Sequence, residues 1–272
     1  MTSVFTFEAG VQWFEAYEAA KQHNLVLVGG FSPRGSVGAA GGWLQGGGHS
    51  FLSPNYGLGM QIPRSVIKPR SHNHYVGVDN VLEITIVTAD GSHVIANAYN
   101  NQNLFWALRG GGGGTWGVVT SVSYKTHPST PFFGAVLNIN STNPDSTRKL
   151  LTEVIRLTPS LVEQGYGGYS NGSTRWFQLF IVSPKVTMEQ NNANFLPLFE
   201  FAHSQPGLSV QNATVPYPDF SSFYETLFAN SRSQVGAPTE LSSWLLPKDV
   251  VQSDKPEDLA TELLKTQWFG YM

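Results

Sequence analysis

The chain has 272 residues, of which 41% are hydrophobic, so it can bury a sizeable core in one large domain or two smaller ones. Its formal net charge is −3 and it has no lysine or arginine cluster, which argues against nucleic acid and anionic membranes as partners. It contains no cysteine, which excludes disulfides, thiolate metal sites, cysteine nucleophiles and cysteinyl cofactor links.

The first part of the chain predicts helices and strands around two stretches rich in glycine. Apolar residues at helical spacing (Val11, Phe14, Tyr17 and Ala20) predict a helix over residues 11–22. The first glycine cluster, residues 29–48, and the second, residues 110–117, together hold 15 of the 28 glycines. The other predicted elements are a strand at 25–28, a loop at 52–59, a hairpin of strands at 79–88 and 93–98, a helix at 103–109 capped by Asn103 or Asn101, and a strand at 117–126.

The composition changes after Pro128, where glycine becomes sparse and strand and helix signals alternate. We therefore expect an α+β fold with a first domain at residues 1–128 and a second at 129–272. The segment 60–77 is basic and poorly patterned, and we take it as an atypical insert in the first domain. In the second domain the patterns predict strands at 133–139 and 175–182 and helices at 147–161, 188–203, 220–228 and 256–266.

The glycine clusters are the strongest functional signal, because glycine lets the backbone approach a ligand closely and adopt positive φ. Residues 112–117 fit the pattern G-x-G-x-x-G, but a helix precedes them and a strand follows, the reverse of a dinucleotide-binding βαβ unit. The P-loop motif and the G-x-S-x-G motif of α/β-hydrolases are both missing from the sequence. Residues 38–50 are better suited to a backbone cradle for pyrophosphate and a flat ring; tight turns with a purely structural role stay an alternative.

Several other side chains have both a functional and a structural interpretation. His49 either touches a ligand or makes a structural hydrogen bond, and Trp43 either stacks on a flat ligand or fills the core. Arg109 either pairs with phosphate or is the cation at a helix C-terminus. The pair His72 and His74 has no nearby carboxylate or cysteine, so we expect a solvated loop and no metal site.

Aromatic residues and glycosylation sequons in the second half are less specific signals. Pocket lining and core packing both stay open for three aromatic side chains, Tyr217, Trp176 and Tyr224. Asn-X-Ser/Thr sequons are a weak sign of a secreted relative, and they occur at Asn140, Asn171 and Asn212. The N-terminal residues do not show the pattern of a signal peptide, so the localisation stays open.

Three motifs in a fixed order carry a resemblance to a known family. They are VGAAGGWLQGGGHSFLSPNYGLG at residues 37–59, DNVLEITIVTADG at 79–91 and NLFWALRGGGGGTWGVVTSVSYKTHP at 103–128. This order resembles the berberine-bridge-enzyme-like FAD-linked oxidases, whose cofactor domain is of the vanillyl-alcohol-oxidase or PCMH type. The resemblance implies a PCMH-type FAD-binding subdomain followed by part of an α+β substrate domain with a mainly antiparallel sheet.

The resemblance also implies which residues contact the cofactor. FAD is expected to be held non-covalently, because the chain has no cysteine for a cysteinyl link. By position, the pyrophosphate, ribityl chain and flavin are lined by Ser36, Val37, Gly38, Gly41, Gly42, Trp43, Gly46, Gly47, Gly48, His49 and Ser50. The backbone of Gly117, Val118 and Val119 is expected on the adenine side. No residue is assigned a catalytic role.

The expected reaction is oxidation of a small-molecule substrate, an alcohol, sugar or similar C–H donor, with hydride transfer to flavin and oxygen as the acceptor. The resemblance covers about the middle of the family's length. Relatives carry an N-terminal subdomain that grips the pyrophosphate and a C-terminal segment near the catalytic base, and neither is matched here. We therefore expect an incomplete oxidoreductase. Relatives are commonly secreted, and the oligomeric state stays open.

Two alternatives to the oxidoreductase remain at this point. The chain is a non-catalytic remnant or the product of wrongly assigned exons, without bound flavin, or it is a carbohydrate-binding module. The first alternative is favoured by the segment 60–77, because relatives run almost directly from the Gly-Leu-Gly loop into Asp-Asn-Val-Leu. Our hypothesis for this segment is an in-frame translated intron, which a comparison with spliced mRNA tests.

Overall fold

The computed structural model describes residues 3–31, 37–56, 80–228, 246–253, 255–266 and 269–271. Ser36, the segment 60–77 and the two histidines at 72 and 74 therefore lie outside the described residues.

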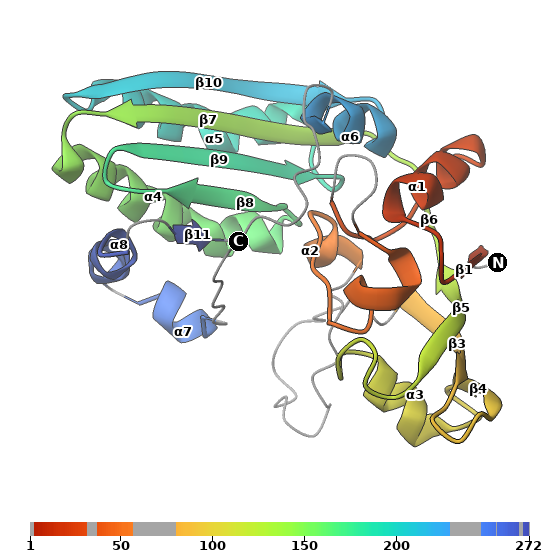
Figure 1. Cartoon of the computed structure of the whole chain (residues 1–272). Coiled ribbons are helices and arrows are strands. Elements are labelled where there is room, and N and C mark those ends of the chain that lie inside the picture. The colour runs from red at the N-terminus through yellow and green to blue at the C-terminus, as the bar shows by residue number, and fades with distance from the viewer. Residues whose placement is uncertain are drawn as a thin grey trace. The chain divides into compact units, whose positions relative to one another are not determined.

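The chain divides into two compact units (Figure 1). Unit 1 comprises Met1–Thr130 and Asp219–Ala237, and unit 2 comprises Pro131–Pro218 and Pro238–Met272. The first junction lies close to the boundary expected from the sequence. Helix α6 (Phe220–Phe228) groups with unit 1, although it follows that boundary in the chain.

Unit 1 contains a four-stranded antiparallel sheet in the order β1-β5-β3-β4. The predicted hairpin is confirmed, because β3 and β4 pair directly across the turn at Gly91. A second, two-stranded sheet joins β2 to β6, and β2 is shorter than the predicted strand. The strands of unit 1 are β1 (Val4–Glu8), β2 (Leu25–Val26), β3 (Val81–Val87), β4 (His93–Asn97), β5 (Val118–Lys125) and β6 (His127–Pro128).

The first predicted helix is confirmed as α1 (Trp13–Gln22), but its buried face differs from the expected one. Trp13 is buried and Phe14 is only half-buried, whereas the spacing had placed Phe14 on the core face. The reason is tertiary: the Trp13 ring fills the space beside Gly29, where a Cβ would lie 2.2 Å from the ring. The backbone N–H of Gln12 donates to Glu15 Oε2 at 2.9 Å, which caps the start of the helix.

One other prediction for unit 1 is wrong, and a second is right for the helix but wrong for its side-chain cap. Residues 52–59 were expected to form a loop, but Ser53–Tyr56 form the helical turn α2. The second predicted helix is confirmed as α3 (Gln102–Leu108) with Asn101 as its N-cap residue. The Asn101 side chain does not cap the helix, because its Nδ2 donates to the Ile95 carbonyl at 2.8 Å instead.

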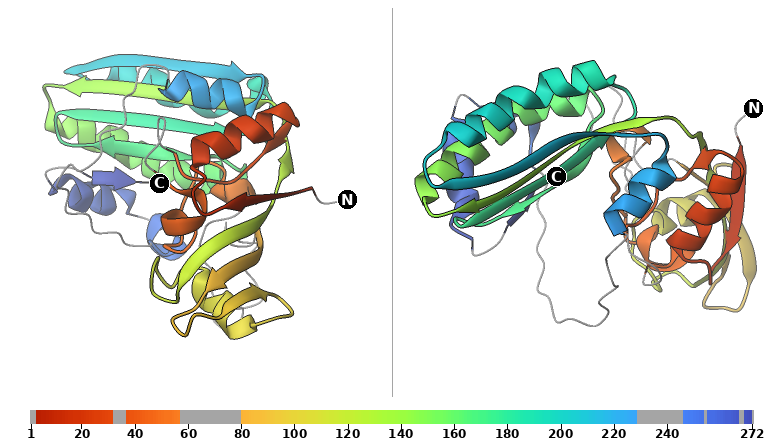
Figure 2. Two further views of the ribbon diagram at one scale, coloured as in Figure 1. Left: turned by 45° about the vertical axis from the view of Figure 1, so that its right-hand side comes forward. Right: turned by 90° about the horizontal axis from the view of Figure 1, so that it is seen from above.

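Unit 2 is built on a five-stranded antiparallel sheet in the order β10-β7-β9-β8-β11, so the α+β fold is confirmed. Helices α4 and α5 cover one face of this sheet (Figure 2), and α8 packs against α4. The elements are β7 (Phe132–Ser141), α4 (Pro144–Glu163), β8 (Gly167–Gly172), β9 (Trp176–Ser183), α5 (Met188–Ser204), β10 (Leu208–Tyr217), α7 (Lys248–Val251), α8 (Pro256–Leu264) and β11 (Phe269–Tyr271).

The core of unit 2 follows from strand alternation. Every second residue of β7 and β9 points to the helices, and these residues are buried with the apolar face of α4. Burial of such side chains is worth roughly 1.5–3 kcal/mol each. The strand and helix members of this core include Ala135, Leu137, Ile139, Leu150, Leu151, Val154, Ile155, Phe177 and Leu179.

A network of polar contacts surrounds His127 in unit 1. The His127 ring stacks on Tyr56 with centroids 4.1 Å apart, and its Nε2 lies 2.8 Å from Asn80 Oδ1. Asn80 Nδ2 donates to the Tyr56 carbonyl, so Oδ1 is the acceptor and His127 Nε2–H is the donor. Burial, together with the charge of Lys125, lowers the pKa of His127 from 6.5 to about 4.

The free energy of unfolding is expected to decrease as the pH falls from 6.5 to about 4. The folded-state pKa of His127 lies below its unfolded value, so the unfolded chain binds more protons in this interval. We expect the decrease to be about 1–2 kcal/mol, because solvent screens the partly exposed ring. Urea denaturation at several pH values measures it. His127→Gln should remove this part of the pH dependence, and replacing the exposed His93 with glutamine should retain it.

Candidate functional site

The two glycine clusters, far apart in the sequence, come together in unit 1. The Gly112 N–H donates to the Gln45 carbonyl at 2.8 Å. A Cβ on Gly113 would lie 3.4 Å from the Gly41 carbonyl oxygen and 3.7 Å from the Gly42 Cα. The backbones of the two clusters are therefore in contact.

The first cluster contains a π-helical turn, η1 (Ala39–Trp43), that the sequence did not predict. It is fixed to the start of α1 by two backbone hydrogen bonds: Ala39 N–H donates to Val11 O at 2.9 Å, and Trp13 N–H donates to Val37 O at 3.1 Å. Such turns are rare and occur frequently at functional sites. Gly41 and Gly42 lie within this turn, and Gly42 is exposed.

The glycines of the first cluster fall into two groups. At Gly38, Gly41 and Gly42, an added Cβ would meet no heavy atom of the described residues within 4 Å. At Gly48, by contrast, an added Cβ would lie 2.4 Å from the Trp43 ring. The space beside Gly48 is filled by the Trp43 side chain. Gly38, Gly41 and Gly42 instead border space that no described residue fills and that a ligand can occupy.

Trp43 packs against the protein rather than standing free in the loop. Its ring meets the Trp13 ring edge to face, with centroids 5.0 Å apart, and it covers Gly30 and Gly48. The side chain is half-buried, so one part of the indole is accessible. The structure thus supports the core interpretation for one face of Trp43, and its contact with a ligand stays a prediction.

The end of the first cluster is held by a serine pair. The Ser50 N–H donates to Ser53 Oγ at 2.9 Å, and the Leu52 N–H donates to Ser50 Oγ at 3.3 Å. Ser50 is buried, and the preceding His49 is exposed. Positive φ angles of 100° and 50° at Gly47 and Gly48 turn the chain toward this serine pair.

The second cluster leads into strand β5 through Gly117. Gly117 has a φ of 143°, and an added Cβ would lie 2.3 Å from the Val87 carbonyl oxygen, so this glycine has a packing role. The two valines that follow point in opposite directions, because Val119 is buried and Val118 is 70% exposed. The guanidinium of Arg109 lies 4.7 Å from the Phe105 ring centroid, a cation–π contact that neither sequence interpretation included.

Gln45 is a residue that the sequence analysis did not single out. Its Nε2 donates to the Gly41 carbonyl at 2.6 Å and to the Ala40 carbonyl at 3.3 Å. Its Oε1 is buried and accepts no hydrogen bond from any described residue. The available signal was its position: Gln45 is the one amide among the glycine and apolar residues of the stretch 37–48.

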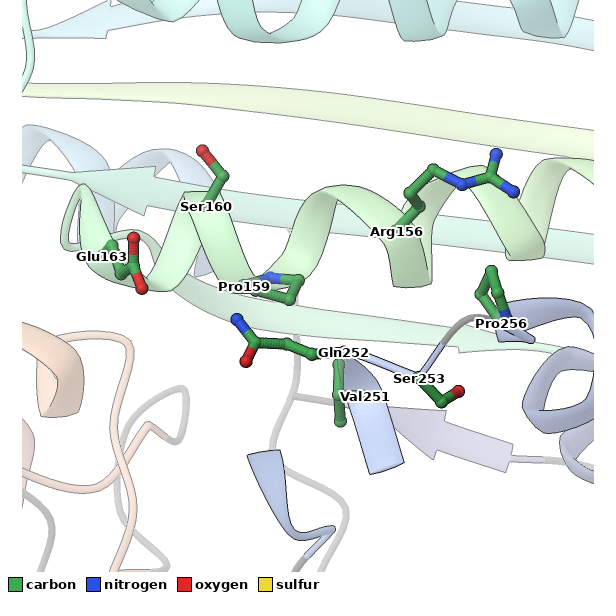
Figure 3. Close-up of a pocket in the computed structure, with 8 residues that line it drawn as sticks. All are labelled: Arg156, Pro159, Ser160, Glu163, Val251, Gln252, Ser253 and Pro256. Atoms are coloured by element: carbon green, nitrogen blue, oxygen red, sulfur yellow. The ribbon is translucent and has the colours of Figure 1, made fainter. Parts of the chain in front are cut away.

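Unit 2 has a surface groove between α4 and the α7–α8 segment. Arg156 forms an ion pair with Glu153, and the polar ends of Arg156, Ser160 and Ser253 point in different directions (Figure 3). The groove thus lacks the convergent polar groups of a specific site. Its lining residues are Arg156, Pro159, Ser160, Glu163, Val251, Gln252, Ser253 and Pro256.

Unit 1 has an apolar surface pocket on α3. It is lined by Trp106 and Trp116, which are 59% and 43% exposed, and by Asn103, Leu104 and Ala107. Among the described residues, no group of three or more histidine, cysteine, aspartate or glutamate side chains is arranged to hold a metal ion. None of the described helices combines the length and the apolar character that crossing a membrane needs.

The face of the unit 2 sheet opposite α4 and α5 carries uncharged side chains. By register, residues of β7, β8 and β9 alternate to this face, which no described helix of unit 2 covers (Figure 2). Burial raises the pKa of Tyr169 on this face to about 12, so its hydroxyl stays protonated at neutral pH. The side chains on this face include Val136, Asn138, Asn140, Tyr169, Asn171, Trp176, Gln178 and Phe180.

Comparison with known proteins places these features in a family. No protein-family model matches the chain. The FAD-linked oxidoreductase OXR2 of Pyricularia oryzae is 33% identical over 264 residues, which are 97% of this chain and 40% of that protein. The chain is homologous over most of its length to FAD-linked oxidoreductases. An uncharacterized FAD-linked oxidoreductase of Arthroderma benhamiae is 36% identical over 221 residues, 79% of this chain and 35% of that protein. The chain thus spans about two fifths of the length of the curated relatives it matches.

Solved structures show the same fold. The VAO-type flavoprotein MtVAO615 of Myceliophthora thermophila C1 has a TM-score of 0.76 at 24% identity, over 97% of this chain and 47% of that chain. The VAO-type flavoprotein MtVAO713 of the same organism has a TM-score of 0.66 at 29% identity, over 82% of this chain and 38% of that chain. The expected vanillyl-alcohol-oxidase-type fold is confirmed.

The described residues fit the cofactor that the names of these relatives imply. Gly38, Gly41 and Gly42 border space that no described side chain fills. Gln45, whose side chain bonds to Gly41, has a buried Oε1 that accepts no hydrogen bond from a described residue, so this acceptor is available to a donor. None of the 272 residues is a cysteine.

Proposed function

We propose that the chain binds FAD non-covalently at the contact of the two glycine clusters and takes part in the oxidation of a small molecule. The observation that carries the proposal is the open space beside Gly38, Gly41 and Gly42, at backbone that contacts the second cluster. FAD supplies the hydride-accepting chemistry when bound, and dioxygen is the proposed electron acceptor.

In this proposal the chain contributes mainly through its backbone. Gly38, Gly41 and Gly42 admit the cofactor because they have no Cβ, and the turn at Gly46–Gly48 adds backbone N–H groups without a cation. His49 is exposed at the end of this turn and is proposed to contact the flavin side. Val37, Trp43, Ser50, Gly117, Val118 and Val119 remain proposed contacts of the same cofactor.

The substrate that we propose is a neutral molecule with hydroxyl groups, an alcohol or a sugar. Support comes from the face of the unit 2 sheet that no described helix of unit 2 covers. Aromatic and amide side chains lie together on this face, and its described side chains carry no charge. Trp176 and Phe180 can pack on C–H groups, and Asn171 and Gln178 can hydrogen-bond to hydroxyls. A charged substrate would find no counter-charge on these strands.

FAD titration of the purified 272-residue chain tests the proposal. We expect the flavin absorbance bands to sharpen and the flavin fluorescence to be quenched, and we expect FAD to co-elute with the protein. FMN, which lacks the adenosine part, should bind more weakly. If the folded chain leaves the FAD spectrum and fluorescence unchanged, the non-catalytic alternative is supported. Peroxide release with alcohols and sugars then tests turnover.

A further inference from the structure

Gln45 lies at the contact between the glycine clusters and bonds to one cluster through its main-chain carbonyl and to the other through its side chain. Its carbonyl accepts the Gly112 N–H of the second cluster at 2.8 Å, and its Nε2 donates to the Gly41 carbonyl of the first cluster at 2.6 Å. The same Nε2 lies 3.3 Å from the Ala40 carbonyl. One residue therefore connects the π-helical turn η1 to the second cluster through its main chain and its side chain.

The amide group is specifically suited to this position. Gln45 is 3% exposed, so its hydrogen bonds are not exchanged with water. Both groups that Nε2 faces are carbonyls, which fixes the amide orientation and turns Oε1 to the other side. A leucine here would leave the Ala40 and Gly41 carbonyls without this donor, and an ionised glutamate would place a negative charge against them.

We propose that Gln45 is a positioning residue that holds Gly41 and Gly42 at the distance from the second cluster that the cofactor requires. This inference rests on the proposed FAD site but assigns a separate role, because Gln45 acts on the backbone of the cradle. Gly42 O also accepts the Gly46 N–H at 2.8 Å, so a shift of η1 propagates into the Gly46–Gly48 turn. We call the hydrogen bonds of Gln45 to Ala40, Gly41 and Gly112 the clamp. Weakening the clamp enlarges the backbone cradle for the cofactor, although all of its glycines remain.

The first test is the FAD affinity of Gln45→Leu in the full chain. We expect the dissociation constant for FAD to rise about tenfold, the effect of removing one hydrogen-bond donor from these two carbonyls. The matched control is Gln102→Leu, because Gln102 also donates its Nε2 to a backbone carbonyl, that of Ala98 at 2.9 Å, at an exposed position on α3. An unchanged dissociation constant in the folded Gln45→Leu chain overturns the inference.

The second variant gives a signature that a general loss of stability does not produce. In Gln45→Glu, a protonated carboxyl can donate its O–H to the Gly41 carbonyl, whereas an ionised carboxylate repels it. We therefore expect FAD affinity close to wild type at acid pH and a decline as the pH rises through the carboxyl pKa. Gln45→Leu should show no such additional decline. A pH profile of Gln45→Glu parallel to that of wild type contradicts the clamp.

A measurement without FAD separates this inference from the proposed function. Amide hydrogen exchange of Gly112 and Gly46 in the flavin-free chain reports on the two backbone bonds that the clamp supports. We expect faster exchange at both amides in Gln45→Leu and wild-type exchange in Gln102→Leu. If wild type binds no FAD but the exchange rates change as expected, the proposed function fails and the clamp holds. If the exchange rates are unchanged in Gln45→Leu, the clamp fails.

Discussion

Gly117→Ala is expected to lower the free energy of unfolding of unit 1 by about 3–5 kcal/mol, as the sum of a strained backbone and an overpacked contact. The added Cβ would lie 2.3 Å from the Val87 carbonyl oxygen and 3.1 Å from two atoms of the Ile86 side chain. The carbonyl belongs to the end of β3, which pairs with β5 at Val118, so neither strand can withdraw without losing its partner. A φ of 143° adds strain for any L-residue.

Gly91→Ala is the matched control for this prediction. Gly91 also has a positive φ, 83°, but an added Cβ there would meet no heavy atom within 4 Å. Its cost is therefore backbone strain alone, about 1–2 kcal/mol. Chemical denaturation followed by tryptophan fluorescence gives both values. Equal losses in the two variants would show that the contact with Val87 contributes nothing.

The sequence predicted elements well where the signal was local. Helix α6 was predicted with its observed bounds, Phe220–Phe228, because its apolar residues repeat at helical spacing. Its packing was not predictable. Phe223 lies 5.3 Å from Phe51, and Tyr224 lies 5.2 Å from Tyr17, measured between ring centroids. These partners are far away in the chain, and nothing in the helix itself identifies them.

Elements formed by long-range constraints were missed. Strand β8 has the sequence Gly-Gly-Tyr-Ser-Asn-Gly, which carries little strand propensity. Gly168 is required there because an added Cβ would lie 2.1 Å from the Phe180 carbonyl oxygen of β9. The turn η1 has no periodic pattern, and it depends on hydrogen bonds to α1 and on the Gln45 contact with Gly112.

The candidate site was predictable as a set of glycines but not as an arrangement. Clustered glycine indicated close backbone approach, and the structure shows two different causes for it. Gly48 makes room for Trp43, whereas Gly42 borders open space. Composition cannot distinguish these causes, because both need the same missing Cβ. The cofactor contacts of individual residues therefore stay predictions.

Gly42→Val is expected to weaken FAD binding about 100-fold while the chain remains folded, since overpacking a rigid contact costs up to about 3 kcal/mol. An added Cβ at Gly42 would meet no heavy atom of the described residues within 4 Å, and the residue is exposed, so the valine has room in the flavin-free protein. The same space is where the cofactor is proposed to lie. The variant thus separates a ligand role from a folding role, which Gly117→Ala cannot do.

The matched control for Gly42→Val is Gly10→Val. Gly10 is also exposed with no heavy atom within 4 Å of an added Cβ, but it lies in the turn between β1 and α1. Both variants should keep the wild-type free energy of unfolding within about 1 kcal/mol, the usual range for exposed substitutions away from packed contacts. Only Gly42→Val should lose FAD affinity, as measured by fluorescence quenching at a fixed pH. Equal FAD affinity in the two variants would mean that the space beside Gly42 is not where the cofactor binds, and the open glycines would then need another explanation.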